Sequence, residues 1–391
     1  MAVAYINPEI IRWGRTRLDI PQQVVADMMH VNVDKYLSWE TGEASPTINQ
    51  AMDIGNILKI PFGYLYLSTP PEADKLPITD FRTIKDLRFQ DASIDLRDMI
   101  NIVLRQQEWY SAYNKEEGKF PLGFIGSFSL TGPVHTVAAD IRETLDWPEN
   151  LFSTVHSRPD YLRTIIDICE KAGITVIRSG VVGNNTHRKL SISEFRGFAL
   201  CGEYSPYIFI NSNDCYAGQI FTLAHELAHL WFGKSGISNL NPDDQELDDF
   251  QHLERTCNRI AAELLAPEPF LPKKTPAIDY QQIIQLSKDF KISTIVVMRR
   301  LLDTKVITRE NFFELYDQMI EENAILEKPR AASSSGGGNF YNTFFAKNGK
   351  SFTDAVISSI QERRLLYRDA ADLLGVSVPV VYKLIDRRSF S

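Results

Sequence analysis

The residues best suited to chemistry form the run His225-Glu226-Leu227-Ala228-His229. The two histidines are four residues apart, so on a helix both imidazoles lie on one face and can bind one metal ion. Glu226 can reach a water molecule held by the metal rather than the metal itself. Zinc lowers the pKa of such a water to about 7, and a neighbouring carboxylate can then accept its proton. The spacing therefore predicts a Zn²⁺ site on a helix over 221–232, with Glu226 as the catalytic base.

A catalytic zinc ion also needs a third protein ligand and one open coordination position. The next predicted helix, 253–265, offers Glu254, with the polar Asn258 one turn later on the same face. His252 is the competing third ligand, because imidazole also binds zinc. Glu263 ranks behind both of these residues. We predict His225, His229 and Glu254 as metal ligands and keep His252 as the alternative.

A framework must hold these two helices, and the pattern around them predicts a mixed domain with a small β-sheet. Apolar residues at helical spacing predict helices, and short β-branched or aromatic runs predict strands. The helices expected outside the site lie over 161–172, 279–302 and 308–325, and the strands over 174–177, 196–201 and 207–210. The segment 233–249 between the two site helices is rich in Gly, Asn and Asp and is expected to be a loop.

The two segments that carry these residues resemble a known family. Residues Phe221–Leu230 look like the active-site helix of the ImmA/IrrE family of metallopeptidases. Residues Glu254–Pro267 are similar to the second signature of that family, roughly E-x-x-A-N-x-F-A-A-x-L-L-x-P. Cys257 replaces Ala and Ile260 replaces Phe, and both changes are apolar and off the expected metal face. The resemblance covers roughly residues 140–275.

The resemblance implies a zincin-like core in which His225, His229 and Glu254 bind zinc and Glu226 is the general base. It also implies a substrate class, because members of this family cleave helix-turn-helix repressors. The residues themselves name no oxyanion-stabilising group. Tyr204 and Tyr207 are candidates only because a phenol can donate a hydrogen bond, and the strand over 207–210 is a candidate to lie beside the cleft.

Composition places the chain among folded globular proteins. Of its 391 residues, 44% are hydrophobic and 24% are charged, and this length suggests two to four domains. No stretch reaches the roughly 18 consecutive apolar residues of a membrane helix, and the N-terminus lacks the pattern of a signal peptide. We therefore expect a cytoplasmic protein without membrane contact. The cysteines have neither metal-site nor disulfide spacing and are expected to be buried, reduced thiols: Cys169, Cys201, Cys215 and Cys257.

Residues 22–37 fit a helix-turn-helix template, with the small Ala26 where the two helices meet. The run 37–47 resembles the ending typical of Xre/Cro-type DNA-binding domains. His30 departs from the template, since the tight turn usually has Gly there. The tentative DNA-binding residues of this segment are Gln22, Asn32, Lys35 and Ser38.

The charge of this N-terminal segment argues against tight DNA binding. Residues 1–80 contain six Lys/Arg and ten Asp/Glu, a net charge of −4, whereas DNA affinity comes largely from neutralised phosphates. The net charge of the whole chain is −8, so any DNA contact needs a local basic patch. Two roles stay open for the segment: contact with a DNA operator, or docking of a protein such as a related repressor.

The C-terminus fits the same helix-turn-helix template, with Ala371, Gly375 and Val381 at its diagnostic positions. Residues 346–391 hold eight Lys/Arg and five Asp/Glu, a net charge of +3. Residues able to meet phosphates are Arg363, Arg364, Arg368, Lys383, Arg387 and Arg388. The alternatives are a small helical hairpin with a solvated basic face, a partner-binding module, and a cover for the active site.

The predicted fold class is α+β and predominantly helical. It combines an N-terminal helix-turn-helix bundle, a zincin-like core with a small β-sheet and the HExxH helix, and a small C-terminal helical unit. The predicted segments are an Xre-type domain, a helical connector, the metallopeptidase domain, a flexible Ser/Gly linker and the C-terminal unit, over 1–70, 71–132, 133–328, 329–340 and 341–391.

Two functions are compatible with this organisation. The first is a zinc endopeptidase that cleaves a helix-turn-helix repressor or a related regulator and is targeted to it by its own helix-turn-helix domain. The second is a DNA-binding regulator, or the antitoxin-like component of a toxin–antitoxin pair with a toxin partner, whose peptidase domain is sensory or catalytically quiet. The intact pattern of His225, Glu226 and His229 favours the first.

Overall fold

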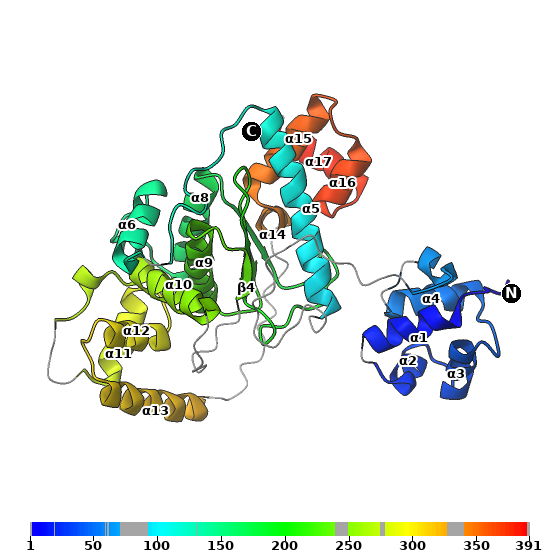
Figure 1. Cartoon of the computed structure of the whole chain (residues 1–391), viewed down its shortest axis with the longest axis horizontal. Coiled ribbons are helices and arrows are strands. Elements are labelled where there is room, and N and C mark those ends of the chain that lie inside the picture. The colour runs from blue at the N-terminus through cyan, green and yellow to red at the C-terminus, as the bar shows by residue number, and fades with distance from the viewer. Residues whose placement is uncertain are drawn as a thin grey trace. The chain divides into compact units, whose positions relative to one another are not determined.

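The computed structural model describes residues 2–18, 20–58, 60, 62–70, 93–130, 132–238, 249–273, 278–326 and 340–388. The chain forms two compact units, Met1–Thr79 and Asp80–Ser391 (Figure 1). The predicted linker over 329–340 and the first part of the predicted connector, 71–92, fall almost entirely outside the described residues. The fold is α+β and predominantly helical, as the sequence predicts.

The first unit is a helical bundle around a small core. Its helices are α1, α2, α3, α4 and the 3-10 helix η1, over Pro8–Arg17, Gln22–Met28, Val33–Thr41, Ile48–Leu58 and Phe62–Tyr66. Ala26 is fully buried where α2 meets α3, as the template requires. His30 has a φ of 54°, so the turn between these helices keeps its left-handed residue although the residue is not glycine.

One buried carboxylate ties three helices of this unit together. Glu40 of α3 accepts hydrogen bonds from Arg15 of α1 at 2.6 Å, from Gln22 of α2 at 2.8 Å and from the Tyr36 hydroxyl at 2.9 Å. Burial opposes the charged form of Glu40, but these donors outweigh it, and the pKa of its carboxyl lies below the usual value. Gln22 therefore has a structural partner within the bundle.

The second unit is built on a four-stranded sheet with the order β1-β3-β2-β4. The strands are Thr175–Ser179, Tyr207–Asn211, Gly197–Leu200 and Gly236–Ser238 in that order. β1 is parallel to β3, and β2 is antiparallel to both β3 and β4. Because β3 is paired on both sides, this strand, a candidate to lie beside the cleft, is interior to the sheet and cannot accept an added peptide strand.

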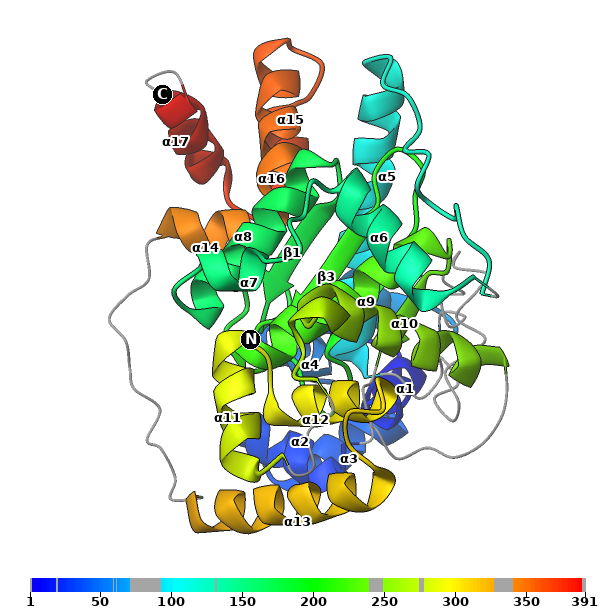
Figure 2. The ribbon, with the colours of Figure 1, turned by 90° about the vertical axis from the view of Figure 1, so that its left-hand side faces the viewer.

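Helices lie against both faces of this sheet (Figures 1 and 2). On one side are α6, α7, α8, α9 and α10, over Val134–Thr144, Leu151–Thr154, Arg158–Lys171, Tyr216–Trp231 and Asp249–Leu265. On the other are α5 and the C-terminal helices α14 to α17, over Ile94–Glu116, Phe340–Asn348, Lys350–Gln361, Tyr367–Leu374 and Val378–Arg388. The short helix η4 and the helices α11, α12 and α13 follow α10, over Glu268–Phe270, Tyr280–Asp289, Thr294–Asp303 and Arg309–Leu326.

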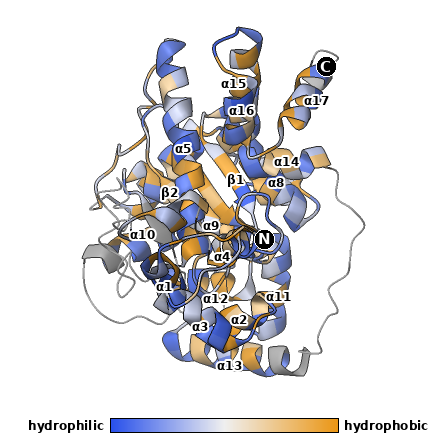
Figure 3. Ribbon diagram, turned by 90° about the vertical axis from the view of Figure 1, so that its right-hand side faces the viewer, coloured by the Kyte–Doolittle hydropathy of each residue, from blue (hydrophilic) through white to orange (hydrophobic). Residues whose placement is uncertain are grey.

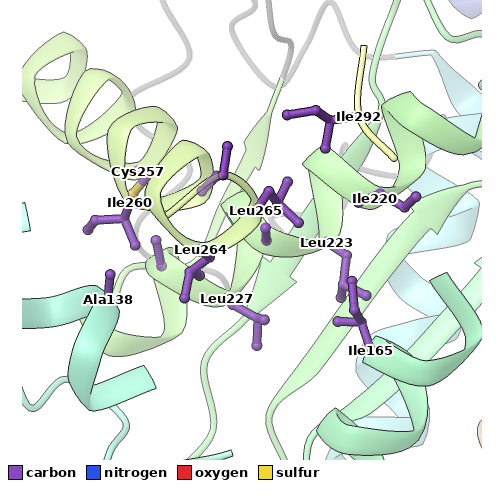
Figure 4. Close-up of a cluster of buried hydrophobic side chains, with 14 of the residues drawn as sticks. Ala138, Ile165, Ile220, Leu223, Leu227, Cys257, Ile260, Leu264, Leu265 and Ile292 are labelled. Carbon is purple, nitrogen blue, oxygen red and sulfur yellow. The ribbon is translucent and has the colours of Figure 1, made fainter. Parts of the chain in front are cut away.

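The largest core cluster joins α9, α10, α6 and α8 to the sheet. Figure 4 shows Leu223 and Leu227 of α9 beside Leu264 and Leu265 of α10. Each of these leucines is at most 1% exposed, and burying a leucine stabilises a fold by about 1.5–3 kcal/mol. Figure 3 shows hydrophobic residues along β1 at the centre of the unit. This packing fixes the relative position of the two helices that carry the predicted ligands.

One half-buried carboxylate links the sheet to the C-terminal helices. Glu170 of α8 accepts the backbone N–H of Val176 on the outer side of β1 at 3.2 Å. Its other oxygen accepts the backbone N–H of Ser351 in α15 at 3.1 Å. Burial raises the pKa of the Glu170 carboxyl, and these two donors limit the rise. The part of the chain predicted as a separate C-terminal unit thus packs on β1 within the second compact unit.

Helix α5, in the predicted connector, is also part of this unit. The Gln107 side chain of α5 donates to the carbonyls of Leu200 and Ser205 at 2.9 Å, and Gln106 donates to Leu373 at 3.0 Å. None of the helices that the structure describes has the length and apolar character needed to cross a bilayer.

Candidate metal centre

Helix α9 carries the first two predicted ligands through the centre of the second unit. It begins after Cys215, whose thiol accepts the N–H of Gly218 at 3.4 Å, and it ends before Gly233, which has a φ of 63°. His225, Glu226 and His229 are at most 1% exposed. A polar triplet this deeply buried needs partners for its hydrogen-bonding atoms.

The two histidines find partners on α10, where Glu254 faces both imidazoles. Its carboxylate oxygens lie 3.2 Å from His225 Nε2 and 3.1 Å from His229 Nε2, and the two Nε2 atoms are 3.0 Å apart. The ligand atoms of these three residues therefore converge on one point. Burial opposes the ionised form of Glu254, but the interactions with the two imidazoles outweigh burial, so the pKa of this carboxyl is lowered.

The donor set fits a zinc ion. Zinc binds nitrogen and oxygen ligands at about 2.0–2.2 Å with tetrahedral geometry, which separates neighbouring ligand atoms by about 3.3–3.5 Å. The observed separations of 3.0–3.2 Å are close to this range. Two imidazoles and one carboxylate also leave one tetrahedral position for water, as in catalytic rather than structural zinc sites.

Asn258, one turn after Glu254, orients the first imidazole. Its Oδ1 atom lies 2.9 Å from His225 Nδ1, which donates the hydrogen bond. The proton on Nδ1 leaves the lone pair on Nε2, the atom that points at the proposed metal position. The Nδ1 atom of His229 has no hydrogen-bond partner within the described part of the chain. Among the described contacts, the hydrogen bond with Asn258 is therefore the main one that orients the two imidazoles from outside the ligand group.

Glu226 lies on the side of α9 that faces strand β2, where Gly197 allows a close approach. A Cβ atom at position 197 would lie 2.4 Å from Thr222 Cγ2, 2.8 Å from the Phe209 carbonyl oxygen and 3.4 Å from Glu226 Oε1. Only glycine fits between these atoms. Sequence reasoning missed this residue, although a glycine inside a strand is itself a signal of close backbone approach.

Two thiols lie near Glu226. Burial raises the pKa of Cys201 to about 12, and the charge of Glu226 adds to the effect. Burial also holds the pKa of Cys257 well above its ordinary value. Both thiols are therefore protonated at neutral pH. All four cysteines are free. Cys169 and Cys257 are buried as predicted, whereas Cys201 is half-buried and Cys215, which caps α9, is exposed.

The other ligand candidates lie elsewhere. His252 is exposed and lines a cavity of about 560 Å³ with His135 and Arg259, on the side of α10 away from Glu254. Glu263 forms an ion pair with Arg300 of α12. The structure thus brings Glu254, and not His252, to the two histidines.

The two tyrosines considered for the oxyanion are held by other contacts. Tyr207 packs edge to face on Phe352 of α15, on the sheet face opposite α9, and it is fully buried. The ring of Tyr204 lies 4.9 Å from the Lys115 ammonium of α5. Neither residue has a described contact with the histidines, so the structure gives no support to either as an oxyanion donor.

The tentative DNA-binding residues do not form one free surface. Gln22 is bonded to Glu40, and the Asn32 side chain caps α3 by accepting the N–H of Asp34 at 3.1 Å. The Ser38 hydroxyl donates to the Lys35 carbonyl at 2.7 Å, and the Lys35 ammonium lies 5.8 Å from the Trp39 ring. Asn32 and Lys35 are exposed, whereas Gln22 and Ser38 are half-buried.

The fold and the site together define a class of protein domain. It is a predominantly helical α+β domain in which two helices, packed against a small sheet, carry a His-His-Glu group. Residues 169–302 match the model of the peptidase family M78, described as the IrrE N-terminal-like domain. This match covers about a third of the chain, includes both site helices and supports the ImmA/IrrE resemblance. Residues 348–387 match a domain of unknown function, DUF8813. The chain matches none of the curated proteins and none of the solved structures compared with it.

Proposed function

We propose that this protein is a zinc-dependent endopeptidase. The observation that carries the proposal is the convergence of His225, His229 and Glu254 within hydrogen-bonding distance, with Glu226 next to the first ligand. The match to the M78 peptidase model supports the same reaction class. Bound zinc would supply a Lewis acid and a water of lowered pKa.

The roles of the side chains follow from their positions. His225, His229 and Glu254 hold the ion, and Asn258 keeps the His225 ring in its orientation through the Nδ1 hydrogen bond. Glu226 accepts the proton of the attacking water and delivers it to the departing amine. Its full burial strengthens these electrostatic interactions, because the local dielectric is lower than that of water.

The proposed substrate is a helix-turn-helix repressor or a related regulator in the cytoplasm. This choice rests on the resemblance to the ImmA/IrrE family, in which such repressors are cleaved, together with the matched domain. The N-terminal bundle would then deliver the peptidase to its target. Its net charge of −4 over residues 1–80 favours docking to a basic, DNA-binding protein over docking to DNA.

The alternative is a DNA-binding regulator or antitoxin-like protein, paired with a toxin, whose peptidase domain is catalytically quiet. The observation in its favour is that each unit contains two short helices joined by a turn with a left-handed residue, α2–α3 with His30 and α16–α17 with Gly375, which is compatible with the helix-turn-helix template. The buried Glu226 beside an assembled ligand set favours the enzyme, because a quiet site has no need of a base.

Zinc content and cleavage separate these functions. Bound zinc is measured in the wild type and in Glu226→Gln, and each is then incubated with candidate repressors. Glu226→Gln should keep zinc and lose cleavage, because only the base is removed. Glu254→Ala should lower zinc affinity, whereas His252→Ala, the matched control on the same helix, should not. A folded wild type unable to take up zinc would refute the enzyme.

A further inference from the structure

The extended segment before α1, residues 2–6, lies on the surface of the first unit with one face on its core. The exposed fraction of its side chains alternates, as in a strand. Val3 and Tyr5 are 46% and 81% exposed. Ala4 and Ile6 are only 2% and 8% exposed and belong to the core of the unit. The segment therefore has the two-sided pattern of a strand at the surface of a fold.

One edge of this segment is paired with the chain at the start of α4. The Ala4 N–H donates to the Pro46 carbonyl at 2.8 Å. The Ile48 N–H donates to the Ala2 carbonyl at 3.1 Å, and these two bonds flank an antiparallel bridge between residues 3 and 47. Because the backbone groups of successive strand residues point to opposite edges, those of residues 3 and 5 point the other way.

This second edge is open. Within the part of the chain that the structure describes, no hydrogen bond engages the backbone N–H or C=O of Val3 or Tyr5. The open edge ends at Asn7, whose N–H donates to the Leu65 carbonyl at 2.7 Å. No charged residue occurs over residues 2–8. Proteins usually protect a strand edge with a charge, a proline or a bulge, so an unprotected apolar edge pairs readily with another strand.

We propose that this edge binds the same edge of a second copy of the chain, as an antiparallel pair with two-fold symmetry. An axis through Ala4 places Val3 opposite Tyr5 of the second copy, and the reverse. Residues opposite one another in this way exchange both backbone hydrogen bonds, so four bonds form and every open group of the edge is used. The small side chain of Ala4 lies at the axis, where the two backbones approach most closely.

The pairing also extends a single bridge into a larger sheet. Each copy of the segment is already paired with residues 46–48, so two copies give a four-stranded antiparallel ribbon. An isolated pair of strands is marginal in water, whereas three or more strands with a hydrophobic face are stable. Ala4 and Ile6, which face the core in each copy, supply that hydrophobic face.

The outward side chains of the segment are suited to each other. Val3 and Tyr5 of opposite copies lie side by side on the exposed face, and β-branched and aromatic residues form favourable cross-strand pairs. Tyr66 and Leu67 follow the residue that closes the edge, and they are 47% and 38% exposed. A second strand in the open edge ends against them, so their apolar surface enlarges the contact.

Charge favours a second copy over a different protein at this edge. The segment has no acidic group with which a basic partner could form an ion pair. A two-fold interface requires a surface that is complementary to itself, and an uncharged strand edge meets this condition. Residues 1–80 carry a net charge of −4, so two copies repel at a distance and salt should strengthen their association. Docking to a basic protein responds to salt in the opposite sense. The proposal is independent of the metal site.

The test is sedimentation velocity of the full chain over a micromolar to submillimolar concentration series. The wild type should shift with concentration from the mass of one chain, 44.5 kDa, towards twice that mass. Raising the salt concentration from about 0.1 to about 1 M, which shortens the Debye length from about 10 to about 3 Å, should increase the dimer fraction.

Two double variants test the register. Val3→Glu/Tyr5→Glu places like charges directly across both cross-strand pairs and should weaken association by about tenfold or more. Val3→Glu/Tyr5→Lys places opposite charges across the same pairs and should restore association to within about threefold of the wild type. Only the proposed register brings positions 3 and 5 of different copies together, so the two variants should differ.

The matched control is Val24→Glu/Met28→Glu on α2, which adds two carboxylates at apolar positions of the same unit that are 42% and 58% exposed. It should leave association unchanged, and circular dichroism melting verifies that all three variants are folded. A wild type that keeps the mass of one chain throughout the series overturns the proposal. Equal weakening by the control, equal behaviour of the two test variants, or weaker association at high salt also overturns it.

Discussion

Replacing Asn258 with alanine tests whether one hydrogen bond sets the metal affinity of the site. The change removes the acceptor 2.9 Å from His225 Nδ1, and His225 is fully buried, so water does not readily replace it. A buried donor left without a partner costs about 1–3 kcal/mol. Since about 1.4 kcal/mol is tenfold in affinity, Asn258→Ala should weaken zinc binding by about 10- to 100-fold, which agrees with the usual effect of residues behind a metal ligand.

The assay is competition for zinc against a chromophoric chelator at fixed pH, with circular dichroism as the check on folding. Asn258→Asp is the matched variant, because its carboxylate still accepts from His225 Nδ1 and should preserve zinc affinity. The reasoning fails if folded Asn258→Ala binds zinc as tightly as the wild type. It also fails if the aspartate variant loses as much zinc affinity as the alanine variant, because a hydrogen-bond acceptor at position 258 would then not determine zinc affinity.

Two further predictions concern the framework. Gly197→Ala should lower the melting temperature of the full chain and disturb the site, because the new Cβ would lie 2.8 Å from a backbone oxygen of β3; a thermal scan that shows wild-type stability would contradict the close approach. In the first unit, the lowered pKa of Glu40 means that its ion pair with Arg15 stabilises the fold above the unfolded carboxyl pKa of about 4.3, and this stability is lost as pH falls through the folded value. Hydrogen exchange measured by mass spectrometry and corrected for the intrinsic rate at each pH should show lower protection of α1–α3 at low pH, and Glu40→Gln should remove that dependence.

The candidate metal site was predictable because its determinants are local. The spacing of His225 and His229 fixes their common helical face, and Glu254 was selected over His252 by the polar and small residues that follow it. The structure places Glu254, and not His252, against both imidazoles. Even Asn258 was visible in the sequence as a polar neighbour of the ligand.

What the sequence did not reveal depends on contacts between distant segments. The pairing of β3 on both sides involves strands from three parts of the chain, and no spacing within 207–210 encodes it. The need for glycine at position 197 arises from α9 and β3 together. The predicted connector contained α5, but its packing on the sheet uses carbonyls about 90 residues away, which periodicity cannot show.

The hydrogen bonds by which Glu170 links β1 to α15 have a consequence for folding during synthesis of the chain. Synthesis runs from the N-terminus, so every predicted zinc ligand has been synthesised by residue 254, while Ser351 follows nearly a hundred residues later. Until then β1, at the end of the sheet, lacks its cover, and an open strand edge pairs readily with another chain. Completing the C-terminal helices therefore closes the sheet, and a prematurely ended chain would carry the full ligand set on a core still open to aggregation.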